Sequence, residues 1–118
     1  MHEKNVALLE NEGFVVARSS NFNLATDRQT SAVQPEYVAE CAEALCCAND
    51  AGGPEIEIGA VLLGCSALRV CTPGFLSALE AKIGLPVVAS TQAFYWHALR
   101  TAGVKDALDG YGCLFREH

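Results

Sequence analysis

Basic residues are scarce in this sequence, and long apolar runs are absent from it. Lys and Arg number eight against 14 Asp and Glu in 118 residues, which leaves a formal net charge of −6. The basic residues are scattered, whereas affinity for a nucleic-acid backbone comes from clustered Lys and Arg. No apolar run approaches the roughly 20 residues that span a bilayer. The composition therefore argues against a nucleic-acid partner and against a membrane partner.

Cysteine is plentiful, but its spacing does not indicate a metal site. The sequence contains Cys41, Cys46, Cys47, Cys65, Cys71 and Cys113. These six form no C-x-x-C pair and no zinc-type Cys/His spacing, so we expect no metal. The first residues lack the basic start and apolar segment of a secretory signal, so we expect a cytoplasmic chain without disulfides. We interpret Cys41, Cys46, Cys47 and Cys71 as small buried hydrophobes, and leave Cys113 unassigned.

Apolar periodicity predicts one small α/β domain that covers residues 1–118. The first two helices are expected over residues 4–11 and from Pro35 to a turn at residues 50–54. A third helix is expected to be capped by Thr72, with Pro73 at its first position, and to end at Gly84. The last helix is expected to be capped by Ser90 or Thr91 and to run to about Gly103. Strands are expected over residues 14–17, 58–64 and 86–89, a long loop over 18–34, and a tail or short strand over 111–115. This alternation indicates three layers around a parallel sheet.

The most informative segment is residues 59–69, a buried strand that ends in a Gly-Cys-Ser turn. Open α/β sheets bind ligands beyond the carboxyl ends of their strands, which is where Cys65 falls. The amides of Ser66 and Ala67 can face an oxyanion, and such donors lower a thiol pKa. Cys65 is therefore the candidate catalytic residue. The alternative interpretations are a buried thiol that closes a strand and, for Ser66, an ordinary turn residue.

With these elements placed, the sequence resembles the C-terminal half of the maleate cis-trans isomerase and arylmalonate decarboxylase family, in the aspartate/glutamate/hydantoin racemase superfamily. The resemblance covers nearly the whole chain. It is carried by residues 8–16 (LLENEGFVV), 33–36 (VQPE), 63–69 (LGCSALR), 84–93 (GLPVVASTQA) and 110–115 (GYGCLF), with Trp96, Leu99, Arg100, Ala102 and Gly103. It implies a truncated flavodoxin-like half of the racemase fold, thiol chemistry on small carboxylates at Cys65, and no cofactor.

The chain also departs from this family. Family members have two such halves around a cleft, and the isomerases and racemases take a second cysteine from the other half, whereas the decarboxylases use one. The strand that opens the half, whose loop carries a substrate-contacting tyrosine, has no counterpart here. It would lie between residues 14–17 and 58–64. Where the isomerases have an asparagine, this chain has Asp27 beside Arg28, and a carboxylate there would repel a carboxylate substrate.

Three more residues are candidates for binding the substrate. Ser90 and Thr91 follow a strand and are expected to cap a helix, and the functional interpretation adds carboxylate binding at that helix N-terminus. Arg69 could hold a carboxylate with two hydrogen bonds, although a solvated surface arginine is the simpler interpretation. His97 has no support as a base and is interpreted as a surface histidine.

Three functions compete at this stage. The first is a thiol-dependent isomerase, racemase or decarboxylase acting on a small carboxylate. The second is a catalytically inactive module that binds an anion. The third is a degenerate fragment that is stable only through self-association. Because an unpaired apolar sheet edge is rarely tolerated, we expect a homodimer, which would also bring two Cys65 thiols together across a shared cleft.

Overall fold

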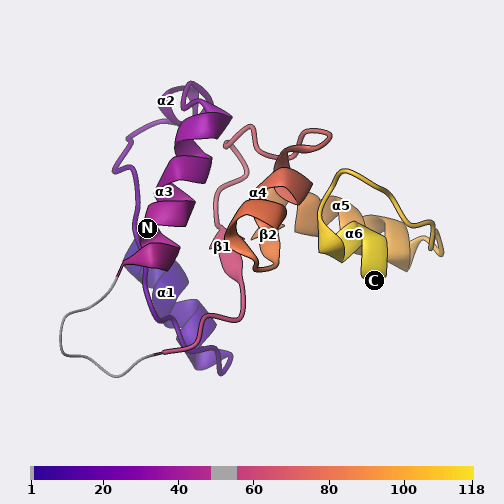
Figure 1. Cartoon of the computed structure of the whole chain (residues 1–118), viewed down its shortest axis with the longest axis horizontal. Helices are drawn as coiled ribbons and strands as arrows, with labels where there is room; N and C mark the ends of the chain where they lie inside the picture. The colour runs from indigo at the N-terminus through magenta and orange to yellow at the C-terminus, as the bar shows by residue number, and fades with distance from the viewer. Residues whose placement is uncertain (1, 49–55) are drawn as a thin grey trace.

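A computed structural model describes residues 2–48 and 56–118, and the predicted turn at residues 50–54 lies outside them (Figure 1). The described residues form helices around a two-stranded parallel sheet. The helices are α1 His2–Asn11, α2 Asp27–Ser31, α3 Pro35–Cys47, α4 Phe75–Ile83, α5 Ser90–Thr101 and α6 Cys113–Glu117, and the strands are β1 Val61–Leu63 and β2 Val87–Ala89. None of these helices is long and apolar enough to cross a membrane.

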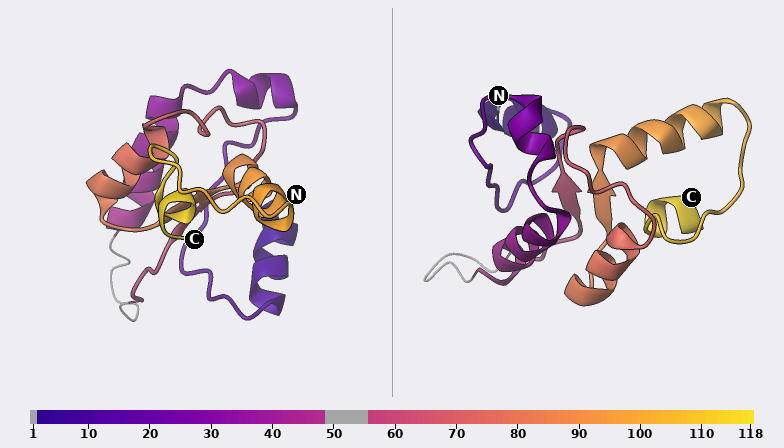
Figure 2. Two further views of the ribbon diagram at one scale, coloured as in Figure 1. Left: turned by 90° about the vertical axis from the view of Figure 1, so that its right-hand side faces the viewer. Right: turned by 90° about the horizontal axis from the view of Figure 1, so that it is seen from above.

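The sheet pairs β1 with β2 in parallel, with Leu63 opposite Ala89, so the strands end at the same edge. Helices α3 and α4 lie on one side of this sheet, and α1 and α5 lie on the other (Figure 2). The predicted α/β class with a parallel sheet between helices is therefore confirmed. The buried core consists of Val38, Ala42, Leu63, Leu68, Val70, Leu76, Leu79, Val87 and Ala89. Each fully buried aliphatic side chain of this kind stabilises a fold by about 1.5–3 kcal/mol.

Residues 14–17 were predicted to form a third strand, and that prediction is wrong. Phe14 and Val15 are 64% and 80% exposed, and the segment has no regular secondary structure and pairs with no described strand. Its sequence favours a strand, but a strand forms only against a partner that satisfies its backbone groups. The segment is instead tied to the end of α3, because the Arg18 guanidinium donates to the carbonyls of Leu45 and Cys46 at 3.4 and 3.1 Å.

Helix α4 begins later than its sequence predicts. Its N-cap is Gly74, with φ of 86°, and not Thr72, so Pro73 stands outside the helix. The amide of Phe75 donates to the Thr72 carbonyl in a turn, and the amide of Gly74 donates to the Gly110 carbonyl at 2.7 Å. This contact with a distant segment fixes the helix start. The predicted end at Gly84 is confirmed, where a left-handed φ of 72° closes the helix.

The carboxyl-terminal residues form helix α6, where a tail or short strand was predicted. The Glu80 carboxylate of α4 accepts hydrogen bonds from the amide of Cys113, the first residue of α6, at 2.9 and 3.1 Å. The Gly112 amide donates to Ser77 Oγ at 3.1 Å. Side chains of α4 therefore satisfy amides that a new helix leaves unpaired, and this favours a helix over a strand.

Candidate functional site

Cys65 follows β1 in a tight turn at the carboxyl edge of the sheet. Its amide donates to the Leu63 carbonyl at 3.0 Å, and its carbonyl accepts from the Leu68 amide at 3.3 Å. The side chain is half-buried and packs against the core. The amides of Ser66 and Ala67, the next two residues, donate to no other described residue. The strand-end position predicted for Cys65 is therefore the one that the fold gives it.

Two hydroxyl groups join this turn to the start of α5. Ser90 Oγ donates to the Leu63 carbonyl at 3.4 Å, and Thr91 Oγ1 donates to the Ser66 carbonyl at 3.2 Å. These bonds connect residues 25 or more apart in the sequence, so they fix the β1 turn against the helix N-terminus. The structure thus gathers Ser66, Ser90 and Thr91 at the edge where Cys65 stands. A hydroxyl that donates to a carbonyl still has lone pairs that accept a hydrogen bond.

Ser90 and Thr91 were also predicted to cap the last helix, and the structure corrects this. The N-cap of α5 is Ala89, and Gln92 Oε1 accepts the Ala89 amide proton at 3.0 Å. The two hydroxyls point to the neighbouring turn, because carbonyls of that turn lie within reach. The first amides of α5 have no partner within the helix, as at any helix N-terminus, and carry partial positive charge toward this edge.

The remaining predicted residues are less closely gathered. Ala67 is half-buried in the Cys65 turn, whereas Arg69 is exposed. Asp27 and Arg28 lie in α2, which replaces part of the predicted loop, and both are exposed. Thr26 and Gln29 form the capping box that starts α2. This pattern is visible in the sequence, although residues 18–34 were predicted to be a loop.

The environments of three other thiols raise their pKa values. Burial raises the pKa of Cys71, and burial together with the nearby Cys47 raises the pKa of Cys46. Burial and a hydrogen bond with Glu80 raise the pKa of Cys113. Since the thiolate is the reactive form, we expect these three thiols to react more slowly at neutral pH than a thiol of ordinary pKa. The predicted burial of Cys47 is wrong, because this last residue of α3 is exposed.

The sequence did not predict the role of the buried Gln92 side chain, which lies next to the end of β2. Gln92 is fully buried, accepts from the Ala89 amide and donates through Nε2 to the Tyr111 carbonyl at 2.5 Å. It therefore links the end of β2 to the carboxyl-terminal segment. The only sequence signal was a glutamine three residues after a strand end, which is the second half of a capping box. No group of three or more side chains suited to hold a metal gathers within residues 2–48 and 56–118.

Comparison with known proteins assigns the family. The model of the family described as "Arylmalonate decarboxylase" matches residues 1–115. The arylmalonate decarboxylase of Bordetella bronchiseptica is 29% identical over 119 residues, which are 99% of this chain and 46% of that protein. The chain therefore belongs to the arylmalonate decarboxylase family, as its sequence motifs predicted. It spans about half the length of the curated relative that it matches.

Solved structures agree with this assignment. A crystal structure of arylmalonate decarboxylase matches with a TM-score of 0.71 at 27% identity, over 96% of this chain and 46% of that one. A glycine-to-cysteine variant of arylmalonate decarboxylase in a sulfate-associated form matches with a TM-score of 0.72 at 25% identity, over the same shares. The fold is thus that of about half of a family member.

Proposed function

We propose that this chain carries a cysteine-centred site for a small carboxylate and that Cys65 acts there as a proton donor in a decarboxylation. The observation that carries the proposal is the pair of hydroxyl contacts that holds the Cys65 turn against the first turn of α5. The half-buried Cys65 belongs to the same turn as the amides of Ser66 and Ala67, which a carboxylate can accept from. The sulfate-associated form of one relative supports oxyanion binding in the family.

The chemistry needs one thiol and no cofactor. In a malonate-type substrate, the bond between the α-carbon and the departing carboxylate breaks, and carbon dioxide leaves. The electron pair remains on the α-carbon and spreads onto the other carboxylate, where the amides of Ser66 and Ala67 stabilise the added charge. The Cys65 thiol then gives its proton to the α-carbon, and the resulting thiolate takes a proton from water. Decarboxylation is favoured over racemisation or isomerisation because those reactions use a second cysteine in this family.

The alternative is an anion-binding module without turnover, and one observation favours it. The chain spans 46% of the length of its relatives, so a complete site in those proteins has a further half to draw on. In that case Ser66, Ser90 and Thr91 bind a carboxylate, and Cys65 is only part of the lining. Binding with no reaction is the outcome that separates this alternative from the enzyme.

We further propose that two copies of this chain associate through the open side of the sheet. Leu62 in β1 is 51% exposed, and the unpaired segment beside α1 exposes Phe14 and Val15 even more. Apolar strand-forming residues in such positions invite pairing with another chain. Light scattering of the native protein should report a dimer, and Leu62→Lys should yield a monomer with the same circular dichroism. A monomeric wild-type chain would refute the dimer.

The test of function uses phenylmalonate and the native chain in heavy water. The expected result is phenylacetate with one deuterium at the α-carbon, detected by NMR. Cys65→Ala should lower the rate by roughly 10²–10⁴-fold, the usual contribution of a positioned general acid. Cys47→Ala, at an exposed thiol, is the matched control and should react like the wild type. Malonate-induced shifts of the Ser66 and Thr91 amides without any turnover would support the binding module instead.

A further inference from the structure

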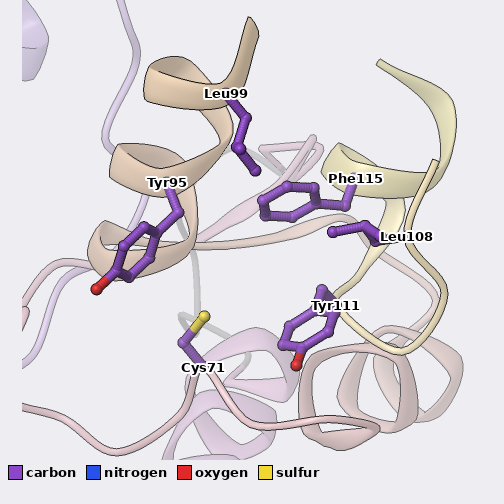
Figure 3. Close-up of a pocket in the computed structure, with 6 residues that line it drawn as sticks. All are labelled: Cys71, Tyr95, Leu99, Leu108, Tyr111 and Phe115. Carbon is purple, nitrogen blue, oxygen red and sulfur yellow. The ribbon is translucent and has the colours of Figure 1, made fainter. Parts of the chain in front are cut away.

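A cavity lies away from the residues of the Cys65 site. Its volume is about 340 Å³, and it is a partly open cavity lined by Cys71, Tyr95, Leu99, Leu108, Tyr111 and Phe115 (Figure 3). The walls come from α5, α6, the loop between them and the segment before α4. None of the residues predicted to bind a carboxylate lines it. A volume near 300 Å³ is at the small end of the range for ligand pockets.

The lining of this cavity is apolar and uncharged. Leu99, Leu108 and Phe115 converge on it, and the Cys71 sulfur faces the same space (Figure 3). The Tyr95 and Tyr111 rings form two further walls, and their hydroxyls point away from the leucine side chains (Figure 3). Burial raises the pKa of Cys71, so its thiol is neutral. The lining therefore offers flat apolar surface with weak hydrogen-bonding groups, and no charge to hold an ion.

Arg100 holds one side of the cavity in place. Its Nε donates to the His118 carbonyl at 3.0 Å. One terminal nitrogen donates to the backbone carbonyl of Val104 at 2.9 Å, and the other to the backbone carbonyl of Asp106 at 3.3 Å. Its guanidinium also lies over the Phe115 ring, with the central carbon 5.9 Å from the ring centroid. The loop after α5 and the end of α6 are thus joined by one side chain, and the charge stays outside the cavity.

The opposite side is held from α4 and α5. Gln92 binds the Tyr111 carbonyl, Ser77 binds the Gly112 amide, and Glu80 binds the Cys113 amide. The Gly74 amide also donates to the Gly110 carbonyl at 2.7 Å, so the backbone is held on both sides of Tyr111. A cavity whose walls are fixed before binding spares the ligand the cost of ordering them. Such a built cavity differs from an apolar patch that is merely exposed.

We propose that this cavity is a binding site for a small uncharged aromatic molecule, such as a substituted phenol. A ring would stack against Phe115 or Tyr111 at edge-to-face or offset distances, which adds to the gain from burying apolar surface. A phenolic hydroxyl could exchange a hydrogen bond with a tyrosine hydroxyl at the mouth. The proposal does not depend on catalysis at Cys65, because the two sites share no lining residue.

The experiment titrates the native protein with 4-fluorophenol and follows the ¹⁹F signal. Binding at a dissociation constant on the order of 1 mM or tighter is expected from a ligand of this size. Intermolecular Overhauser effects should join the ring protons to the methyl groups of Leu99 and Leu108 in the wild type. Saturable binding with those contacts supports the site. A linear, non-saturating response, or contacts with other methyl groups only, overturns it.

Two matched variants and two competitors complete the test. Leu108→Trp fills the cavity from a loop and should weaken binding at least tenfold, while Val104→Trp in the same loop, at nearly equal exposure, should not. 4-Fluorobenzoate should bind at least tenfold more weakly, because the cavity has no counter-charge, and malonate should not compete. Equal binding by both variants, equal binding of the benzoate, or displacement by malonate would refute a separate uncharged site.

Discussion

Gln92 offers the sharpest test of how this fold is held together. Its side chain is fully buried, and both of its polar atoms are used, one by the Ala89 amide and one by the Tyr111 carbonyl. Gln92→Leu keeps the size of the side chain but leaves that amide and that carbonyl without their partner. Ala89 is 1% exposed, so water cannot replace the lost acceptor at its amide.

The expected loss is about 2–4 kcal/mol, since each buried group left without a partner costs about 1–3 kcal/mol and the Tyr111 carbonyl is only partly buried. At roughly 4 °C for each kcal/mol in a chain of this length, the melting midpoint should fall by about 8–16 °C. Urea titration and thermal melting by circular dichroism measure both quantities. Hydrogen exchange at the Ala89 amide should also accelerate.

Gln34→Leu is the matched control for this experiment. Gln34 is exposed, and its side chain donates only to the nearby Ala32 carbonyl at 3.3 Å. Its replacement should change the free energy of unfolding by no more than about 0.5 kcal/mol. If Gln92→Leu is as mild as this control, then Gln92 does not link β2 to the carboxyl-terminal segment in the way described.

Two further predictions concern the same end of the molecule. Gly112→Ala should lower the free energy of unfolding by about 1–3 kcal/mol, because φ is 82° and a new Cβ would lie 3.0 Å from both Glu80 Oε1 and Gln92 Nε2. Gly59 has open space around it, so Gly59→Ala is the control and should leave the melting temperature nearly unchanged. The raised pKa values of Cys46, Cys71 and Cys113 mean that the folded chain holds these protons more tightly than the unfolded chain. Their contribution to stability is therefore complete below the ordinary thiol pKa of 9.0 and is lost as the pH rises above it. Removing one of these thiols with Cys113→Ala should therefore make the melting temperature fall less steeply at alkaline pH. An unchanged fall would contradict this.

Local sequence patterns predict a large part of this fold. Apolar periodicity placed α3 and α4, the glycine at residue 84 ended α4, and the apolar run before Cys65 contains β1, although this strand is less buried than predicted, with Leu62 51% exposed. These features depend on neighbours within a few residues, which is why the sequence alone reveals them. The strand-end position of Cys65 followed from the same local reading.

The features that escaped prediction depend on distant partners. Residues 14–17 have strand-forming side chains, yet no described strand pairs with them. The hydroxyls of Ser90 and Thr91 donate to carbonyls at the end of β1 and in the turn after it, and do not cap their own helix. The Glu80 carboxylate accepts a hydrogen bond from the amide of Cys113, 33 positions away, where α6 begins. Such choices follow from tertiary packing, which no short sequence window contains.

The measurement that tests the central claim most directly is alkylation of the native protein by iodoacetamide, mapped by mass spectrometry from slightly acidic to alkaline pH. We predict that Cys65 reacts faster than Cys71 and Cys113, and that malonate slows the alkylation of Cys65 while leaving that of the exposed Cys47 unaffected. Protection at Cys65 alone would locate the anion beside this thiol. A Cys65 that reacts no faster than Cys71 or Cys113, or that malonate fails to protect, would contradict a cysteine-centred carboxylate site.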